Sequence, residues 1–299
     1  MTLPAFSVIV PTYRRPEKLA RCLASLLRQT YPPSRFEVIV VDDAAMGREL
    51  EPLVSATRPY ACELVSQAHR GPAAARNAGA RAARGRLLAF TDDDCEPAAD
   101  WLDVLEQKMS AADQPLLVGG RVVNALAADP FASASQALVD FLCEKQNREL
   151  GCARLLTSNN LCVPTDAFLE LGGFDTTFAG AGGEDRELCW RWGAAGHRAA
   201  FAPEAVVYHA HDMTLREFVR QHHAYGRGAA LLRRRADAHG YGPLPLERLS
   251  FYFDLLAYPL RGAAVTARVR TSLLFALSQV ANAAGYCDER VRGSRGFSG

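Results

Sequence analysis

The chain carries the stretch Arg86-Leu-Leu-Ala-Phe-Thr-Asp-Asp-Asp94, from which its fold is predicted. The apolar residues are typical of a buried β-strand, and three adjacent carboxylates follow that strand directly. Two earlier stretches have a similar design. Phe6-Ser-Val-Ile-Val10 is a predicted strand that stops at Pro11, and Phe36-Glu-Val-Ile-Val-Val41 runs into Asp42-Asp43. Residues 62–66 form a further predicted strand.

Helical segments separate these strands. Residues 16–29 carry apolar side chains at helical spacing, and residues 71–84 form an alanine-rich helix with Pro72 near its start, where a missing N–H costs little. Strands that alternate with helices indicate βαβ units and a parallel sheet. Ligands of such sheets bind at the carboxyl edge, so the polar residues after the strands are predicted to form a site.

The rhythm changes beyond residue 110, where longer and less regular stretches separate the strands. We predict strands at 116–123, 155–163 and 205–209, and helices at 184–195 and 215–232. Gly240-Tyr-Gly-Pro-Leu-Pro245 then breaks the pattern, and two apolar helical stretches follow at 249–265 and 271–286. The predicted fold class is α/β, with a mixed, mainly parallel sheet flanked by helices and a helical C-terminal extension.

The composition of the 299 residues is that of an ordinary globular protein, with 49% hydrophobic and 22% charged residues. The eight cysteines have no zinc-ligand spacing, which favours a reducing compartment. No signal peptide is evident, and the longest uncharged run, residues 271–287, is shorter than the roughly 20 residues of a spanning helix. A cytoplasmic location is expected, with peripheral attachment to the cytoplasmic face of a membrane left open.

Charge is divided unevenly along the chain. Residues 1–212 hold 21 basic and 27 acidic residues, a net −6, whereas residues 213–299 hold 13 and 6, a net +7. All 13 of these C-terminal cations are arginine. An arginine-rich segment with apolar helices is typical of a membrane-surface element, and equally of a solvated cap or an oligomer interface.

Asp92, Asp93 and Asp94 present three adjacent carboxylates, which repel one another and raise each other's pKa. A divalent cation relieves this repulsion. Oxygen ligands of this kind suit Mg²⁺ or Mn²⁺, which commonly bridge carboxylates to substrate phosphates. The alternative is an acidic turn that caps a helix starting near Pro97.

Four motifs in order, Val8-Ile-Val-Pro-Thr-Tyr-Arg-Arg15, Val40-Val-Asp-Asp43, Arg70-Gly-Pro-Ala-Ala-Ala-Arg-Asn-Ala-Gly79 and Phe90-Thr-Asp-Asp-Asp94, resemble the nucleotide-sugar half of family 2 glycosyltransferases of the GT-A fold. The resemblance covers about residues 5–235 and continues in later motifs. These are Thr157-Ser-Asn-Asn-Leu161, Gly173-Phe-Asp175, Gly183-Glu-Asp-Arg-Glu-Leu188 and Tyr208-His-Ala-His211. The resemblance implies a glycosyltransferase domain at 1–235, with a nucleotide-sugar half at about 1–110 and an acceptor half at about 111–235, followed by an extension at 236–299.

The resemblance also implies a donor site for a nucleoside diphosphate sugar. It assigns this site to Pro11, Thr12, Tyr13, Arg14, Asp42, Asp43, Arg70, Arg76, Asn77, Asp92 and Asp93. Arginines at a helix N-terminus favour anions, in keeping with a diphosphate there. An ordinary strand-ending turn explains residues 11–13 equally well, and a solvated helix face is the alternative for the arginines.

The resemblance implies that Asp185 is the base that deprotonates the acceptor hydroxyl and that Glu184 orients that base or the acceptor. A carboxylate opposite the leaving group implies one-step transfer with inversion at the anomeric carbon. The alternative is that both carboxylates only stabilise a helix N-terminus. The preceding run, Ala179-Gly-Ala-Gly-Gly183, is a candidate lid.

The metal site implied by the resemblance includes Asp92, Asp94 and either His209 or His211, between which the sequence does not choose. Asn159 and Asn160 are candidate acceptor-binding residues, with a simple turn as the alternative. The expected cofactor is Mn²⁺ or Mg²⁺. The expected partners are a nucleoside diphosphate sugar and a hydroxyl acceptor such as a glycan, a lipid-linked molecule or a small molecule, as in polysaccharide biosynthesis, and no nucleic acid.

One departure from the family bears on the type of transfer. Processive synthases of this family carry Gln-x-x-Arg-Trp after the Glu-Asp pair, whereas this chain has Gln221-His-His-Ala-Tyr225. A single-transfer enzyme is therefore favoured. A non-catalytic nucleotide- or carbohydrate-binding module of the same fold is the alternative. A nucleotidyltransferase or a dinucleotide-dependent dehydrogenase requires a glycine-rich loop after the first strand, and residues 11–15 contain no glycine.

Overall fold

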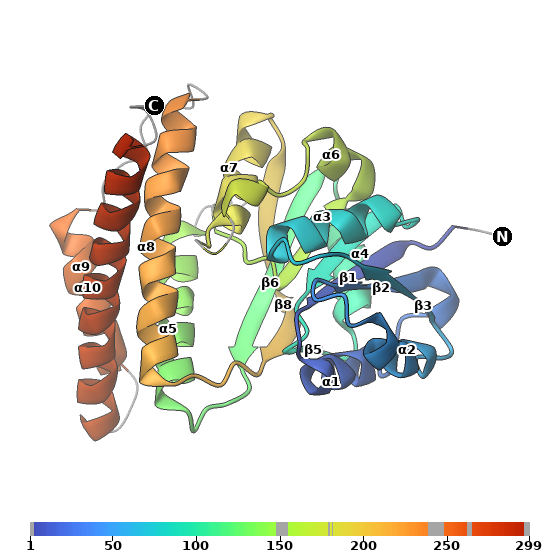
Figure 1. The fold of residues 1–299 in the computed structure, drawn as a ribbon, viewed down its shortest axis with the longest axis horizontal. Coiled ribbons are helices and arrows are strands. Elements are labelled where there is room, and N and C mark those ends of the chain that lie inside the picture. Colours follow the sequence, from blue (N-terminus) through green and yellow to red (C-terminus); the bar gives the residue numbers. More distant parts are fainter. Residues whose placement is uncertain are drawn as a thin grey trace. The chain divides into compact units, whose positions relative to one another are not determined.

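In the part of the chain that the structure describes, eight strands form one mixed sheet in the order β3-β2-β1-β4-β7-β6-β8-β5. The computed structural model describes residues 3–147, 155–178, 180, 182–238, 248–261 and 265–295 (Figure 1). The strands are β1 (Phe6–Thr12), β2 (Phe36–Asp42), β3 (Ala61–Ser66), β4 (Leu87–Thr91), β5 (Cys95–Pro97), β6 (Leu116–Asn124), β7 (Asn160–Pro164) and β8 (Arg198–His209).

The N-terminal half of the sheet is parallel. Strand β1 pairs in parallel with β2 and β4, and β2 pairs in parallel with β3. Strand β7 then runs antiparallel to both β4 and β6, and β8 lies parallel to β6. The predicted mixed, mainly parallel α/β sheet is confirmed. Because β1, β2 and β4 point the same way, the residues that follow them meet at one edge.

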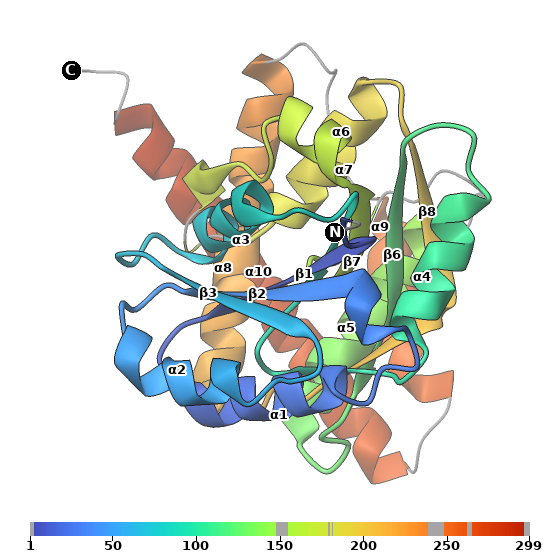
Figure 2. The same cartoon turned by 90° about the vertical axis from the view of Figure 1, so that its right-hand side faces the viewer.

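Helices cover both faces of this sheet. They are α1 (Pro16–Leu26), α2 (Gly47–Ser55), α3 (Pro72–Ala82), α4 (Trp101–Ser110), α6 (Thr165–Glu170) and α7 (Glu184–Ala194), with 3-10 turns η1 (Pro33–Arg35) and η2 (Thr176–Phe178). Figure 2 shows α3 on one side of β1 to β3, and α1 and α2 on the other. Alternate strand residues enter different cores, with Val8 and Val10 on the α1 side and Ile9 on the α3 side.

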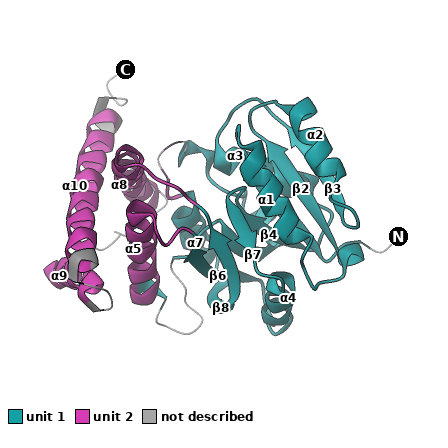
Figure 3. Cartoon of the chain, turned by 90° about the horizontal axis from the view of Figure 1, so that it is seen from below, with its two compact units in different colours: residues 1–125, 146–179, 184–210 teal, residues 126–145, 180–183, 211–299 magenta. Residues whose placement is uncertain are grey.

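The described chain divides into two compact units (Figure 3). Residues 1–125, 146–179 and 184–210 form the first unit, which holds the sheet, and residues 126–145, 180–183 and 211–299 form the second. A domain boundary at residue 235 stays a prediction.

The second unit is helical. Its elements are α5 (Pro130–Gln146), α8 (Leu215–Ala238), α9 (Leu249–Ala257), η3 (Tyr258–Arg261) and α10 (Val265–Arg295). Phe141, Phe218 and Phe275 form the centre of its apolar core. Helices α8 and α10 approach so closely that a Cβ on Gly285 would overlap the carbonyl oxygen of His223. Glu289 of α10 also binds Arg227 and Arg234 of α8 at 3.0 and 3.1 Å.

Several element boundaries differ from the sequence prediction. Strand β7 begins at Asn160 rather than at residue 155, because the backbone of Leu155 bonds to the side chain of Asn147 at 2.7 and 3.0 Å instead of to a strand. Strand β1 continues past Pro11, where β4 no longer pairs with it and no N–H is needed. Strand β8 begins at Arg198, before the predicted residue 205.

Among the described helices, α2, α5 and α6 were not predicted, and the helix expected near Pro97 begins at Trp101, after β5. The break at residues 240–245, and Ala179 and Ala181 of the glycine run, lie outside the described residues. Within the described part of the chain, no helix combines the length and the apolar character needed to cross a bilayer.

Candidate active site

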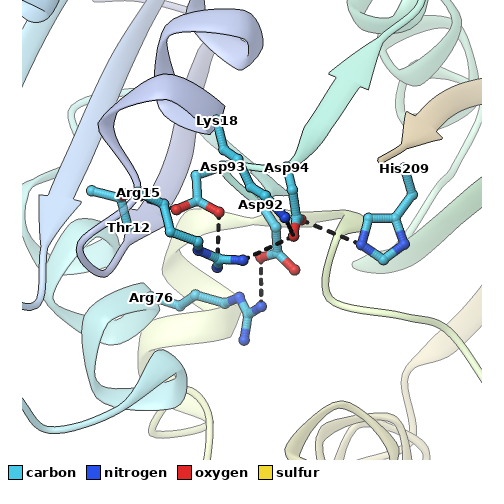
Figure 4. Close-up of polar contacts among 8 residues, drawn as sticks. All are labelled: Thr12, Arg15, Lys18, Arg76, Asp92, Asp93, Asp94 and His209. Carbon is cyan, nitrogen blue, oxygen red and sulfur yellow. Dashed lines mark hydrogen bonds and ion pairs between the residues drawn. The ribbon is translucent and has the colours of Figure 1, made fainter. Parts of the chain in front are cut away.

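The three aspartates occupy the turn between β4 and β5, at the carboxyl edge of the parallel strands. Asp93 is fully buried and Asp94 nearly so, whereas Asp92 is half-buried. Arg15 lies within ion-pairing distance of both Asp93 and Asp94, whereas Arg76 pairs with Asp92 (Figure 4). The local topology therefore brings the predicted donor-site carboxylates together with positive charge from β1–α1 and α3.

Asp93 binds to the beginning of the chain. Thr12 Oγ1 donates a hydrogen bond of 2.7 Å to Asp93 Oδ2, and Arg15 Nη2 lies 2.8 Å from Asp93 Oδ1. Burial raises the pKa of Asp93 to about 6, the charge of Asp94 also raises it, and the charge of Arg15 works against both. This carboxylate thus fixes the loop after β1 beside the other two aspartates.

Asp94 has the most varied surroundings of the three. Arg15 Nη1 and Lys18 Nζ lie 2.9 and 3.8 Å from its Oδ2, and His209 Nε2 lies 3.3 Å from its Oδ1. His209 arrives there because β8 pairs with β5, with Cys95 opposite His209. The backbone N–H of Ala210 also donates to the Asp94 carbonyl at 2.8 Å.

These residues fit a divalent cation. Ligand atoms of Asp94, Cys95 and His209 lie within 4.8 Å of one another, and the Asp92 carboxylate is half-exposed on the same turn. Carboxylate and imidazole ligands suit Mn²⁺, and the carboxylates alone suit Mg²⁺. Burial raises the pKa of the Cys95 thiol well above its usual value, and the neighbouring aspartates raise it further. His211 belongs to the second unit, and its role stays a prediction.

Arg76 connects the aspartate turn to α7. Its side chain is buried, with Nη2 at 2.7 Å from Asp92 Oδ1 and Nη1 at 3.2 Å from Glu184 Oε1. The guanidinium carbon also lies 5.7 Å from the centre of the Phe174 ring. Burial lowers the pKa of Arg76, but the two carboxylates more than offset that effect. One buried cation therefore holds a carboxylate of the aspartate turn and a carboxylate of α7.

Asp185 lies in the first turn of α7. Its Oδ1 accepts a 2.8 Å hydrogen bond from the backbone N–H of Arg186. Burial raises the pKa of Asp185 to about 6, and the adjacent Glu184 raises it as well, whereas Arg76 lowers it. A carboxylate with this pKa is mostly ionised at neutral pH and is a stronger base than an exposed one.

Asp42 and Asp43 order the loop that precedes α3. Asp43 accepts hydrogen bonds from Gln67 Nε2 and from the backbone N–H groups of Arg70 and Gly71 at 2.7, 2.8 and 2.9 Å, and His69 Nδ1 lies 2.8 Å away. Asp42 accepts from the Ala44 N–H. Gly71 has φ +86°, which favours glycine at this turn. The Asp43 carboxylate is thus occupied by the chain itself, and donor contact by it stays a prediction.

Tyr13 and Arg14 form an exposed aromatic and cationic surface at the same edge. The Tyr13 ring stacks on His69 with 4.3 Å between centroids, and the Arg14 guanidinium lies 5.3 Å from the Tyr13 centroid. Arg70, which follows His69 in the sequence, is also exposed. Aromatic and guanidinium groups of this kind can stack against a nucleobase.

Two of the three candidate asparagines, Asn77 and Asn160, form hydrogen bonds that join distant segments of the chain. Asn77 donates to the Phe174 carbonyl and accepts from the Phe174 N–H, both at 2.8 Å. Asn160 accepts from Trp101 Nε1 and donates to the carbonyls of Arg121 and Ala205. Asn159 differs, because its Oδ1 is buried without a hydrogen-bond partner. Ligand binding by these three residues stays a prediction.

Three residues of the site were not predicted from the sequence, namely Arg15, Lys18 and His69. Arg15 follows Arg14 in the quoted motif, and His69 precedes Arg70, so both were close to predicted residues. Arg15 and its partner Asp94 are 79 residues apart in the chain, and His69 and its partner Asp43 are 26 apart. Only the folded arrangement of β1, β2 and β4 reveals these pairs.

Comparison with known families gives two matches. Residues 7–165 match Glycosyl transferase family 2, and residues 121–285 match Glycosyl transferase family group 2. Glycosyltransferase AglE of Haloferax volcanii is 31% identical over 211 residues, which cover 70% of this chain and 67% of that protein. The pre-mycofactocin glycosyltransferase of Mycobacterium tuberculosis is 31% identical, over 76% of this chain and 47% of that protein, so the chain spans about half its length.

Solved structures with a similar fold include two glycosyltransferases. Mannosyltransferase PcManGT from Pyrobaculum calidifontis, in complex with GDP-Man and Mn²⁺, has a TM-score of 0.62 at 20% identity, covering 99% of this chain and 81% of that one. TarS from Staphylococcus aureus has a TM-score of 0.56 at 16% identity, covering 94% and 54%. These likenesses confirm the GT-A type of fold.

Proposed function

Because the chain belongs to glycosyl transferase family 2 and is a glycosyltransferase, we propose that it moves a sugar from a nucleoside diphosphate sugar to a hydroxyl acceptor. The transfer is a single inverting displacement, assisted by a divalent cation. The observation that carries this proposal is the contact of Arg76 with both Asp92 and Glu184, at 2.7 and 3.2 Å. It unites the two acidic motifs of the chain in one site.

Asp94 and His209 are the proposed metal ligands, with Asp92 beside them. When bound, the cation neutralises charge on the diphosphate leaving group. The candidate ligand atoms support this assignment, because two carboxylates and an imidazole gather at the sheet edge. In the structure Arg15 and Lys18 supply positive charge to Asp94 there. The similar fold of a mannosyltransferase solved with GDP-Man and Mn²⁺ also supports it.

Asp185 is the proposed base. The acceptor oxygen attacks the anomeric carbon, the bond from that carbon to the diphosphate oxygen breaks, and the hydroxyl proton passes to the Asp185 carboxylate. Glu184 raises the pKa of Asp185 and is itself oriented by Arg76. Attack opposite the leaving group inverts the anomeric configuration.

Donor recognition is proposed for the exposed residues at the strand edge. Tyr13, stacked on His69, offers a ring face for the base, and Arg14 and Arg70 offer cations for the diphosphate. Thr12 and Asp43 position the loops around them through hydrogen bonds to Asp93 and from the Arg70 and Gly71 N–H groups. Donor contact is also proposed for Pro11, Asp42 and Asn77. Asn159, with its unpartnered Oδ1, is the proposed acceptor-binding residue.

We also propose a hydroxyl acceptor borne by a lipid, with the arginine-rich residues 213–299 in contact with a membrane. The +7 balance of that segment, 13 basic against 6 acidic residues, supports attraction to an anionic surface. A single transfer, rather than polymerisation, fits the sequence Gln221-His-His-Ala-Tyr225.

A donor panel tests the proposal. Thermal unfolding of the full chain is measured with a set of nucleotide sugars, each with Mn²⁺, with Mg²⁺ and with excess chelator. We expect one donor to raise the midpoint only when the ion is present, and to be hydrolysed or transferred under the same conditions. Full activity in excess chelator would overturn the metal assignment.

A further inference from the structure

Helix α9 is apolar on two opposite faces. Its inner face packs Phe251 and Leu255 into the core of the second unit, and Leu255 is only 2% exposed. On the outer face Leu249 is 78% exposed and Phe253 is 73% exposed. A surface helix ordinarily turns polar side chains outward. The apolar outer face of α9 is instead typical of a face that contacts another surface.

Helix α10 extends this surface. Ser272 Oγ donates a 3.3 Å hydrogen bond to the carbonyl of Leu256, which brings the first turns of α10 beside α9. On those turns Val269 and Leu273 are 55% and 66% exposed. We name the exposed apolar side chains of α9, η3 and the first turns of α10 the α9–α10 surface. Its members are Leu249, Tyr252, Phe253, Leu256, Leu260, Val269 and Leu273.

Arginines border the α9–α10 surface. Arg248 stands directly before α9 and Arg270 lies next to Val269, and both are exposed. The acidic residue within α9, Asp254, is bound to Lys145 with 2.6 Å between Nζ and Oδ2. Among the described residues of these helix turns the border is therefore basic, which complements an anionic surface.

The charge also argues against a second copy of the chain as the occupant. A two-fold dimer brings the same patch of both copies together, so Arg248 and Arg270 of one copy would face those of the other. Like charges in such an interface are unfavourable. A bilayer with anionic headgroups instead provides acyl chains for the apolar side chains and phosphates for the arginines.

We propose that the α9–α10 surface docks on an anionic lipid bilayer. Leu249, Phe253 and Leu273 enter the boundary between headgroups and acyl chains, while Arg248 and Arg270 contact lipid phosphates. This inference rests on the membrane contact proposed above and names the surface that makes it. It does not depend on the identity of the donor.

Vesicle sedimentation of the full chain tests this proposal. Vesicles of phosphatidylcholine with about 30% phosphatidylserine are compared with pure phosphatidylcholine at low salt. We expect wild type to sediment with the anionic vesicles, and Leu249→Glu/Phe253→Glu to bind at least about tenfold more weakly. Leu273→Glu should also bind more weakly. Leu169→Glu on α6, which replaces a 41% exposed leucine, should sediment as wild type.

Three results would overturn the proposal. These are wild type that stays in the supernatant, variants of the α9–α10 surface that sediment as wild type, and a wild-type dimer that the double substitution dissociates without any vesicle binding. Donor-dependent thermal stabilisation, measured on the same variants, should be retained. Wild type that fails to bind vesicles but is stabilised by a donor would therefore contradict only the membrane surface. Wild type that no donor stabilises would instead contradict the proposed transferase reaction.

Discussion

Arg76 and Glu184 are separated by 108 residues in the chain, yet Arg76 Nη1 lies 3.2 Å from Glu184 Oε1. The other terminal nitrogen of the same guanidinium lies 2.7 Å from Asp92. Because buried charges destabilise a protein unless they are paired, this cation stabilises the turn after β4 and the start of α7 together. The proposed donor and base sites thus form one electrostatic network.

Replacement of Arg76 by methionine should destabilise the fold. The change leaves Asp92 and Glu184 without their buried counter-charge, and breaking such a pair costs about 3 to 5 kcal/mol. Urea denaturation measures the free energy of unfolding. Arg81→Met, an exposed position on the same helix, is the control and should change it by less than about 0.5 kcal/mol. Equal effects of the two substitutions would contradict the role of Arg76.

Removal of the Asp94 carboxylate should abolish Mn²⁺ binding. Asp94→Asn keeps the shape of the side chain but loses the charge that we assign to the cation. His209→Ala should weaken Mn²⁺ binding by at least about tenfold. Electron paramagnetic resonance of free Mn²⁺ measures both affinities, with Asp166→Asn on the surface of α6 as the control. Wild-type affinity in Asp94→Asn would refute the metal site.

The pKa of Asp185, raised to about 6, predicts opposite pH effects on activity and stability. The base works when ionised, so turnover should rise with pH through about 6 and then level off. In the unfolded chain this carboxyl has a pKa of about 4, so the folded state binds the proton more tightly. Its contribution to the free energy of unfolding is therefore greatest below pH 4 and is lost as pH rises towards about 6.

Asp185→Asn removes this titration. The variant should lack a loss of about 2 to 3 kcal/mol that wild type undergoes between about pH 4 and pH 7. Chemical denaturation of both proteins across that range measures the difference. Parallel pH profiles of stability in the two proteins would show that Asp185 does not have a raised pKa.

The close approach of α8 and α10 predicts different effects of two glycine substitutions. Gly285→Ala should destabilise the chain, because the added Cβ overlaps the His223 carbonyl. Gly193→Ala in α7 meets no atom within 4 Å and should stabilise it by about 0.5 to 1 kcal/mol, since alanine favours helix. Thermal unfolding measures both. A Gly285→Ala protein as stable as wild type would show that the helices are not packed at this point.

The parallel half of the fold could be predicted because its strands are continuous apolar runs that end in polar residues. Phe36 to Asp42 is buried at every position, as expected of a strand covered on both faces. Helix α5 was missed because its alanines and serines, from Pro130 to Gln146, give a weak apolar periodicity. The start of β7 depends on the Asn147–Leu155 contact, which no local pattern reveals.

The candidate site was predicted in its location more than in its contacts. The order of the motifs predicted that Asp92 to Asp94 and Glu184 to Asp185 belong to the site. Their connection through Arg76 depends on tertiary structure and was not predicted. The contacts of Asp43 and Asn77 with loop backbone were likewise beyond the reach of sequence patterns. Local sequence records residue types, whereas partner choice is fixed by the packing of distant segments.

The turnover of Asp185→Asn, measured beside its donor affinity, tests the central claim most directly. The amide keeps the shape of the carboxylate but cannot accept the acceptor proton. We predict that turnover falls by about 100-fold or more while the donor dissociation constant, measured calorimetrically with Mn²⁺, stays that of wild type. Glu170→Gln on α6 should match wild type in both. Wild-type turnover in Asp185→Asn, or a loss of donor binding as large as the loss of transfer, would contradict the account.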